Sequence, residues 1–477
     1  MDSKNQVRDY LQSNNLGIGF QDLYNHVISK KNCMLCGTCT TLCPRIGMNE
    51  EEPMLLESDP ECSTCFKFCP RTFFPEELFE KELFNGNTSK SDKLGFYQKI
   101  IAAKCTDLNV MKVAQNGGLV TSLLIHALES GLIDGVLLTN KDDKWFPKPV
   151  VATTPGEILS CAGSKYTIAP TLKPYKDAVN EFKLKKLAFV GMPCQIQAVR
   201  KLQLFSPLSK EFGNFELIIG LYCFSNYSYD LISKFVQGEL GVSLSDVKKF
   251  DVSHGKFSIY LKNGLIKEVS IKLTKKYNWE SCQYCKDYSA EFADISIGSV
   301  GAFEDNWSSV ILRTDIGARI FNNTLEAAKI ITSNNIDLSK IEKEAQRKKT
   351  QISHIDEQTF ISLRSLNLSD FEIKTYTTLL SLGTANKSIL SKILETKEDV
   401  IINVLDKLKH REWITITNGS YHSVNPTFVI NNEIHKLRKS LLGRISKLKG
   451  ELLPNLESLY AQNNFRHLRH DENLDLI

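Results

Sequence analysis

The sequence CMLCGTCTTLCP at residues 33–44, followed by CSTCFKFCP at residues 62–70, decides how the start of this chain folds. In the first stretch two, two and three residues separate four cysteines, and a proline follows the last one. This spacing is typical of 4Fe–4S clusters: three thiolates lie on one tight turn, and the fourth reaches a neighbouring cluster. We therefore expect the segment to fold around iron–sulfur clusters.

The second stretch lacks the first cysteine of the repeat, and counting back three residues places Asp59 at that position. The crossing of fourth ligands between clusters assigns one cluster to Cys33, Cys36, Cys39 and Cys69. It assigns the other cluster to Cys43, Cys62 and Cys65, with Asp59 as an oxygen ligand or with one iron absent. Because a carboxylate is a harder ligand than a thiolate, the second cluster is expected to be more labile.

Zinc and disulfide bonds are the alternative uses of these cysteines. Structural zinc usually takes two ligand pairs separated by a longer span, which differs from four cysteines closed by a proline. Residues 1–30 contain no apolar signal region, so nothing indicates secretion and an oxidising compartment. We expect a cytoplasmic protein with a lead-in at 1–30 and a ferredoxin-like 4Fe–4S domain at 31–84.

Length and composition indicate a globular protein of several domains. The chain has 477 residues, of which 42% are hydrophobic and 24% charged, and its net charge is +4. So small a charge favours neither nucleic acid nor an acidic membrane surface as a partner of the whole chain. No run of eighteen apolar residues occurs, so no membrane insertion is expected.

From residue 95 to residue 335, short apolar runs alternate with helical patterns. Strands are expected at 99–103, 135–139, 149–153, 186–190, 217–221, 257–261, 266–271, 294–298 and 309–313. Helices are expected at 119–129 and 196–202. The mixture predicts an α/β or α+β domain with a mixed sheet.

Two small-residue loops in this domain have room for a ligand. Gly117 and Gly118 precede the helix at 119–129, whose first N–H groups are free for a phosphate or a flavin edge. Ser164, Lys165 and Tyr166 follow a second small-residue loop. An ordinary turn is the alternative interpretation of both loops.

Four further cysteines lie at or just beyond the ends of predicted elements, where ligands converge in α/β folds. They are Cys194, Cys223, Cys282 and Cys285. Their convergence would make a third cluster, or else a zinc site. Cys105 and Cys161 are interpreted instead as small buried hydrophobic residues.

Five motifs, in order and spacing, resemble the beta subunits of coenzyme F-420-reducing hydrogenases and F-420-linked dehydrogenases. They are GGLVTSLL (117–124), AGSKY (162–166), GMPCQIQAVRK (191–201), the strand that ends at Cys223, and SCQYCKD (281–287) followed by ADISIGSVG (293–301). The resemblance implies an FAD-binding domain that exchanges hydride with coenzyme F-420 as substrate. It also implies a 4Fe–4S cluster on Cys194, Cys223, Cys282 and Cys285, and a flavin pocket lined by Gly117, Gly118, Ser164, Lys165 and Tyr166.

The last third of the chain predicts helices around 368–382, 387–394 and 396–408, and Asn418-Gly419 predicts a tight hairpin. Thr396 and Asp399 are expected to cap the third helix. The order resembles the winged helix-turn-helix domain of archaeal TrmB-type regulators, over 360–429. An amphipathic helix at 430–462, ending near Pro454, needs a partner for its apolar stripe.

The sequence therefore predicts a multi-domain iron–sulfur flavoprotein with two or three 4Fe–4S clusters. It would pass electrons from coenzyme F-420 through FAD to ferredoxin or a catalytic partner subunit. The alternative is a redox-sensing transcription regulator of the TrmB type. Glu398 and Asp399 lie where a recognition helix meets phosphates, so DNA binding is less favoured than protein docking or a homodimer through the last helix.

Overall fold

The computed structural model describes residues 19–49, 51–57, 62, 64–84, 88–204, 214–351, 355 and 357–471. The chain divides into two compact units, 1–351 and 352–477. Within the described residues, no helix combines the length and the apolar character needed to cross a membrane. Asp59 and most of the predicted lead-in lie outside the described residues.

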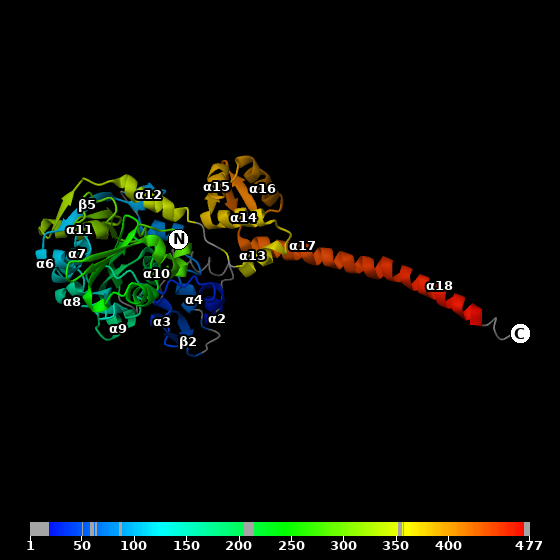
Figure 1. Cartoon of the computed structure of the whole chain (residues 1–477), viewed down its shortest axis with the longest axis horizontal. Coiled ribbons are helices and arrows are strands. Elements are labelled where there is room, and N and C mark those ends of the chain that lie inside the picture. The colour runs from blue at the N-terminus through cyan, green and yellow to red at the C-terminus, as the bar shows by residue number, and fades with distance from the viewer. Residues whose placement is uncertain are drawn as a thin grey trace. The chain divides into compact units, whose positions relative to one another are not determined.

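A mixed sheet of eight strands organises the first unit (Figure 1). Its strands, in spatial order, are β15 (Ile330–Ser333), β5 (Lys99–Cys105), β14 (Ser308–Leu312), β13 (Ile295–Gly298), β9 (Asn214–Leu221), β8 (Lys186–Gly191), β6 (Gly135–Lys141) and β7 (Pro147–Ala152). Strands β13, β9, β8 and β6 run parallel, and the outer pairs are antiparallel. The expected mixed α/β architecture is present.

Alternating side chains give this sheet two buried faces. In β8, Ala188 and Val190 face one hydrophobic core, whereas Leu187 and Phe189 face another. Side chains alternate between the two faces in any strand. When both faces are covered, the sequence of the strand is therefore almost continuously apolar. Both faces are therefore covered by other elements.

Helices and the cysteine-rich segment supply that cover. One core includes residues of α7 (Leu119–Glu129), α8 (Pro155–Ser160) and α11 (Asp315–Glu326). The opposite core includes residues of α9 (Tyr175–Asn180), α10 (Pro193–Leu204), α4 (Thr64–Phe68) and α5 (Glu76–Leu83). The cysteine-rich segment is thus packed into the same unit as the sheet.

The cysteine-rich segment is built from short elements. These are α2 (Phe20–Leu23), η1 (Tyr24–Ile28), α3 (Thr38–Leu42), β1 (Ile46–Met48), β2 (Pro53–Leu55), α4 and α5, followed by the small ribbon of β3 (Ser89–Ser91) and β4 (Gly95–Tyr97). Leu23, Val27 and Phe66 form a small core against which four of its cysteines pack.

A second, three-stranded antiparallel sheet is joined to the main one. It consists of β10 (Val247–Ser253), β11 (Lys256–Leu261) and β12 (Ile266–Ser270). The π-helix η3 (Leu231–Glu239) packs on it. The short 3-10 segments η4 (Leu244–Asp246), η5 (Ile271–Tyr277) and η6 (Glu280–Tyr284) and the short helix α6 (Leu108–Val113) complete this part.

The first unit ends with the helix α12 (Leu338–Lys349). Asp337 accepts a hydrogen bond from the Lys340 N–H and caps this helix. Ile341 and Ala345 are fully buried on one side of it. Lys343 and Arg347 therefore lie on the solvent side of an amphipathic helix, whereas Lys348 is buried.

The second unit begins with helices and a small sheet. Its elements are α13 (Glu357–Arg364), α14 (Asp370–Leu382), β16 (Thr384–Ala385), α15 (Lys387–Ile393), α16 (Glu398–His410), β17 (Ile414–Thr417) and β18 (Ser420–Ser423). Ser369 and Glu372 form a capping box at α14. The expected cap by Thr396 and Asp399 is wrong, because α16 begins after Lys397 and no side chain of the described residues caps it.

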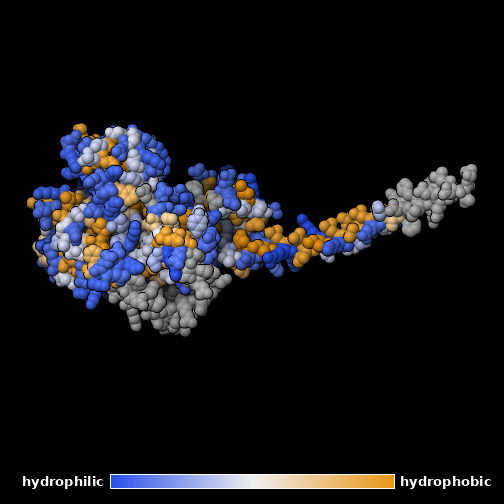
Figure 2. Space-filling view, turned by 90° about the horizontal axis from the view of Figure 1, so that it is seen from below, coloured by the Kyte–Doolittle hydropathy of each residue, from blue (hydrophilic) through white to orange (hydrophobic). Residues whose placement is uncertain are grey.

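The second unit ends in one long helical segment, α17 (Pro426–Lys447), η7 (Leu448–Leu452) and α18 (Leu453–Asp471). Pro454 does not end it, contrary to expectation, and lies two residues after η7, the π-helical turn inside this segment. Figure 2 shows hydrophobic residues gathered along this helix. Leu437, Leu441 and Leu448 are more than half exposed there.

Candidate redox site

Two cysteines of the main domain lie beyond the carboxyl ends of adjacent parallel strands. Cys194 follows β8 at the start of α10, and Cys223 follows β9. Strands β8 and β9 pair along their length, with Gly191 opposite Gly220. Their ends meet at one edge of the sheet, which is where ligands bind in open α/β folds.

Cys282 and Cys285, from η6 and the residue after it, join these two thiols. Burial raises the pKa of the Cys194 thiol well above its usual value, and the Cys285, Cys223 and Cys282 thiols raise it further. The Asn226 N–H donates to Cys282 Sγ at 3.3 Å. Four sulfur atoms from three elements therefore share one buried site.

Helix α12 supports this site from outside. Lys348, which is 1% exposed, donates from Nζ to the carbonyl oxygens of Phe224 and Cys282, the latter at 2.8 Å. Its charge lowers the pKa of the Cys223 and Cys282 thiols, against the larger opposing effect of burial. A buried cation beside thiolates stabilises their negative charge.

The seven N-terminal cysteines fall into two groups. Burial raises the pKa of Cys33 to about 12, and the Cys36 and Cys69 thiols add to it. Burial likewise raises the pKa of Cys39, helped by Cys36, Cys33 and Cys69. Burial raises the pKa of Cys65 to about 11, and there the neighbouring thiols are Cys43 and Cys62. Cys69 therefore lies with the first stretch, and Cys43 lies with the second.

The donor set of these three groups is all sulfur. Among the described residues, no three His, Cys, Asp or Glu side chains are arranged to hold a single metal ion. In a 4Fe–4S cluster each thiolate binds a different iron, so its ligands surround a body several atoms wide. Three groups of buried thiols fit such a cluster in chemistry, because soft thiolates select iron–sulfur centres.

The loop before α7 lies against strands β5 and β14 of the sheet. Gly118 has a φ of +68° and caps α7 without a side chain, and a Cβ on Gly117 would lie 2.9 Å from the Ser308 N. Both glycines are thus required by backbone geometry and packing. The first N–H groups of α7 have no partner within the helix, as at any helix N-terminus.

The loop at 161–166 contacts this one, and two of its side chains form hydrogen bonds within the protein. Gln115 accepts from the Ser164 N–H and donates to the Phe250 carbonyl and to Asp251 Oδ1. Lys165 Nζ donates to three carbonyls of its own loop, those of residues 161, 162 and 163. Tyr166 lies beside Asp251, and its hydroxyl accepts from the Val252 N–H.

An open hollow of about 400 Å³ lies beside the loop before α7. It is lined by Met111, Ala114, Gln115, Asn116, Lys249, Asp305 and Asn306. This volume is within the range of small-molecule sites, and amide and charged side chains predominate in it. The lining therefore fits a polar cofactor edge such as that of FAD.

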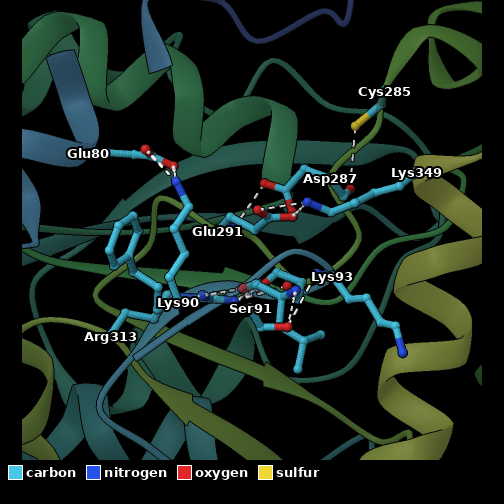
Figure 3. A network of polar contacts seen from close by, with 12 residues as sticks. Glu80, Lys90, Ser91, Lys93, Cys285, Asp287, Glu291, Arg313 and Lys349 are labelled. Atoms are coloured by element: carbon cyan, nitrogen blue, oxygen red, sulfur yellow. Dashed lines mark hydrogen bonds and ion pairs between the residues drawn. The ribbon is translucent and has the colours of Figure 1, made fainter. Parts of the chain in front are cut away.

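A network of polar contacts borders the Cys285 loop (Figure 3). Cys285 Sγ lies 3.5 Å from the Asp287 carbonyl oxygen, and the Glu291 N–H donates to Asp287 Oδ2 at 2.9 Å. Lys349 Nζ pairs with Glu291 at 2.8 Å. Arg313, fully buried, donates to carbonyls of Leu94 and Phe96 at 2.7 Å each. The network fixes the loop to β4 and α12.

Sequence reasoning missed the side chains that connect these loops. Asp251 lies in a stretch with no distinctive motif, and Lys348 is one lysine among several in a basic helix. Only spatial contacts distinguish such residues from solvent-exposed ones. Gln115, which directly precedes the predicted glycine loop in a short polar stretch, is the one for which a sequence signal existed.

Comparison with known proteins identifies these segments. Residues 100–176 and 184–363 match the N-terminal and C-terminal family models of the beta subunit of coenzyme F420 hydrogenase/dehydrogenase. Residues 363–428 match the family model of the sugar-specific transcriptional regulator TrmB.

Several curated proteins are similar. The beta subunit of the coenzyme F420 hydrogenase of Methanococcus voltae is 39% identical over 57% of this chain and 98% of its own length. A component of the F(420)H(2) dehydrogenase of Methanosarcina mazei is 31% identical, over 64% of this chain and 86% of its own length. The coenzyme F420-dependent sulfite reductase of Methanocaldococcus jannaschii is 33% identical over 69% of this chain and 53% of its own length.

A solved structure shares the fold. A chain of the F420-reducing NiFe hydrogenase complex from Methanosarcina barkeri superposes with a TM-score of 0.53 and 34% identity. The match covers 58% of this chain and 94% of that one. Together these comparisons show that the chain belongs to the family of coenzyme F420 hydrogenase/dehydrogenase beta subunits.

Proposed function

We propose that the chain transfers hydride between coenzyme F-420 and a bound FAD, and passes single electrons onward through iron–sulfur clusters. As a member of its family it is an F-420-dependent oxidoreductase. The proposals that it binds FAD and that electrons pass through clusters rest on the arrangement of the candidate redox site. They are supported by one observation: Cys194, Cys223, Cys282 and Cys285 lie together at the edge of the sheet where the adjacent parallel strands β8 and β9 end.

Two loops and the hollow beside them would hold the flavin. The α7 N-terminus after Gly118 offers N–H groups, Gln115 ties the loop at 161–166 to strand β10, and the hollow beside Asn116 opens to solvent. When bound, FAD supplies the conversion between two-electron hydride transfer and one-electron transfer to clusters. The residues contribute binding, orientation and exclusion of water.

The cluster ligands would be three sets of four, three and four cysteines. We assign Cys33, Cys36, Cys39 and Cys69 to one cluster, Cys43, Cys62 and Cys65 to a second, with Asp59 as a candidate oxygen ligand, and Cys194, Cys223, Cys282 and Cys285 to a third. The N-terminal sets, which share the cysteine spacing of ferredoxins, would form the route to an external acceptor. That acceptor is ferredoxin or a catalytic partner subunit.

An anaerobic absorbance experiment tests this function. The protein is reconstituted with iron, sulfide and FAD, and reduced coenzyme F-420 is added while NADPH is added to a parallel sample. We expect the flavin and cluster bands to bleach rapidly with reduced F-420 alone. No bleaching by reduced F-420, in protein that holds FAD and clusters, would contradict the proposal.

The match of residues 363–428 to the TrmB family favours a second candidate, a redox-responsive DNA-binding regulator. On α16, Glu398 pairs with Lys387 at 3.4 Å, and Asp399 is exposed. Acidic residues at this helix start oppose binding to phosphates, whereas Lys407, Lys409 and His410 at its end favour it. Fluorescence anisotropy with double-stranded DNA at two salt concentrations decides between protein docking and DNA binding by this winged-helix candidate.

A further inference from the structure

Lys201 is a buried cation on the helix that carries Cys194. It lies seven residues after Cys194 on α10 and is fully buried. Its Nζ donates to the carbonyl oxygens of Cys69 at 2.7 Å and Phe73 at 2.9 Å. The same Nζ lies 3.7 Å from the centroid of the Phe73 ring. One helix therefore connects the Cys194 site to the cysteine-rich segment.

Arg71 is a second cation in the same region. Its Nε and Nη2 atoms are buried and have no hydrogen-bond partner among the residues that the structure describes. Burial raises the pKa of both the Cys36 and the Cys194 thiols, and the Arg71 guanidinium partly offsets the rise in each case. Arg71 follows Cys69 by two residues, and Cys36 and Cys194 pack into the same hydrophobic cluster, so a buried charge there lies near both groups of cysteines.

Backbone contacts show which N-terminal group faces the main domain. Trp279 Nε1 donates to the Cys33 carbonyl at 2.7 Å, and the Leu172 N–H donates to the Cys36 carbonyl at 3.0 Å. A Cβ on Gly37 would lie 2.7 Å from the Lys173 N, so the backbone approaches too closely for a side chain. The group of Cys33, Cys36, Cys39 and Cys69 is thus the one docked against the main domain.

We propose that Lys201 and Arg71 are positioning residues that make the Cys33–Cys36–Cys39–Cys69 cluster the partner of the Cys194 cluster in electron exchange. This inference rests on the proposed function. A cluster gains one negative charge on reduction, and a buried cation nearby stabilises the reduced form and raises the reduction potential. In the electron exchange one cluster is oxidised and the other is reduced.

The two cations differ in what they act on. Arg71 influences both groups of thiols, whereas Lys201 interacts with Cys69 and Cys36 of the N-terminal group. Lys201, which donates to the Cys69 carbonyl, therefore acts most strongly on the potential of the N-terminal cluster, whereas the Arg71 charge acts on both potentials. The difference favours electron flow from the Cys194 cluster toward the N-terminal segment.

The test is an anaerobic redox titration followed by electron paramagnetic resonance, with iron content measured in parallel. In Lys201→Met, at a fixed applied potential, we expect the reduced-to-oxidised ratio of one cluster to fall about tenfold, which is about 59 mV for a one-electron couple. Lys201→Arg should restore the wild-type ratio. Lys67→Met is the matched control, because Lys67 lies between Cys65 and Cys69 in sequence but is exposed and screened by solvent.

Either of two results with the lysine variants overturns the inference: an unchanged potential in Lys201→Met with full iron content, or an equal shift in Lys67→Met. If Lys201→Met loses iron, Arg71→Gln carries the test, and two cluster signals should then shift in the same direction. An unaltered potential in Arg71→Gln would overturn the inference as well. Wild-type protein that takes up no iron would instead contradict the proposed function itself.

Discussion

The buried ion pair between Arg200 and Asp294 gives the sharpest prediction for the fold around the site. Arg200 Nη2 lies 2.8 Å from Asp294 Oδ1, and the two side chains are 2% and 4% exposed. Arg200 Nε also donates to the Phe292 carbonyl at 2.7 Å. Because Arg200 is on α10, the pair fixes the helix that begins near Cys194 to the start of β13.

Asp294 is satisfied on both oxygens. Oδ1 also accepts from Thr314 Oγ1, and Oδ2 accepts from the Ile218 N–H, each at 2.8 Å. Asp294→Asn removes the charge that balances Arg200 and turns an NH₂ group toward one of these donors. Removing one partner of a buried pair costs about 3–5 kcal/mol, since the remaining charge stays buried and uncompensated. We expect a loss of this size in the free energy of unfolding.

Urea unfolding followed by tryptophan fluorescence measures the loss. Three of the four tryptophans precede Gln351, so the signal reports mainly on the first unit. Glu80→Gln is the matched control, because Glu80 pairs with Lys90 at 2.9 Å at the surface, where such a pair contributes about 0–1 kcal/mol. A loss in Asp294→Asn that equals the loss in the control would refute the reasoning.

Three further predictions concern the loop, the pH dependence and the long helix. Gly118→Val should destabilise the first unit by about 1–2 kcal/mol and lower FAD retention, because φ is +68° at this position and a Cβ would lie 3.0 Å from Val110. Unfolding curves and the flavin content of the purified protein test this prediction. Burial raises the pKa of Glu291 from 4.5 to about 7, and the Asp287 carboxylate contributes to the rise. As pH increases, the Glu291 carboxyl therefore loses its proton in the unfolded chain before it does so in the folded protein. The free energy of unfolding should then fall between about pH 4.5 and pH 7, by up to roughly 3 kcal/mol. Glu291→Gln should flatten that dependence in melting curves between pH 5.5 and 8, and an unchanged slope would count against the raised pKa. If the apolar stripe of the long helix pairs with a second copy, replacing Leu441 together with Leu448 by lysine should convert a dimer into a monomer in light scattering, and a monomeric wild type would contradict this pairing.

The sheet was predictable because its strands are continuous apolar runs. All nine predicted strands overlap observed strands, and the helix at 119–129 has the predicted bounds. Strand β10 was missed, since its sequence VKKFDVS carries two lysines and an aspartate and buries only Val247 and Phe250. A half-exposed strand with weak alternation gives little signal in a single sequence.

Local rules failed where tertiary contacts decide the structure. Helix α12 forms on a strongly basic sequence because Ile341 and Ala345 pack into a core that only the fold creates. Lys201 resembles any lysine near a helix end, and its burial depends on the Cys69 and Phe73 carbonyls, which lie more than 120 residues earlier in the chain. Spacing predicts which cysteines form a group, but the cations that surround the groups require the three-dimensional structure.

The route of electrons through the Cys194 site is the central claim, and one variant tests it directly. The Cys194→Ala variant is reduced anaerobically with reduced coenzyme F-420. Flavin absorbance and the electron paramagnetic resonance signal of the N-terminal clusters are followed in time. The control is Cys105→Ala, which replaces another buried cysteine. We predict that flavin in Cys194→Ala is reduced as in the control while the N-terminal clusters stay oxidised. Reduction of those clusters at the control rate would contradict the account.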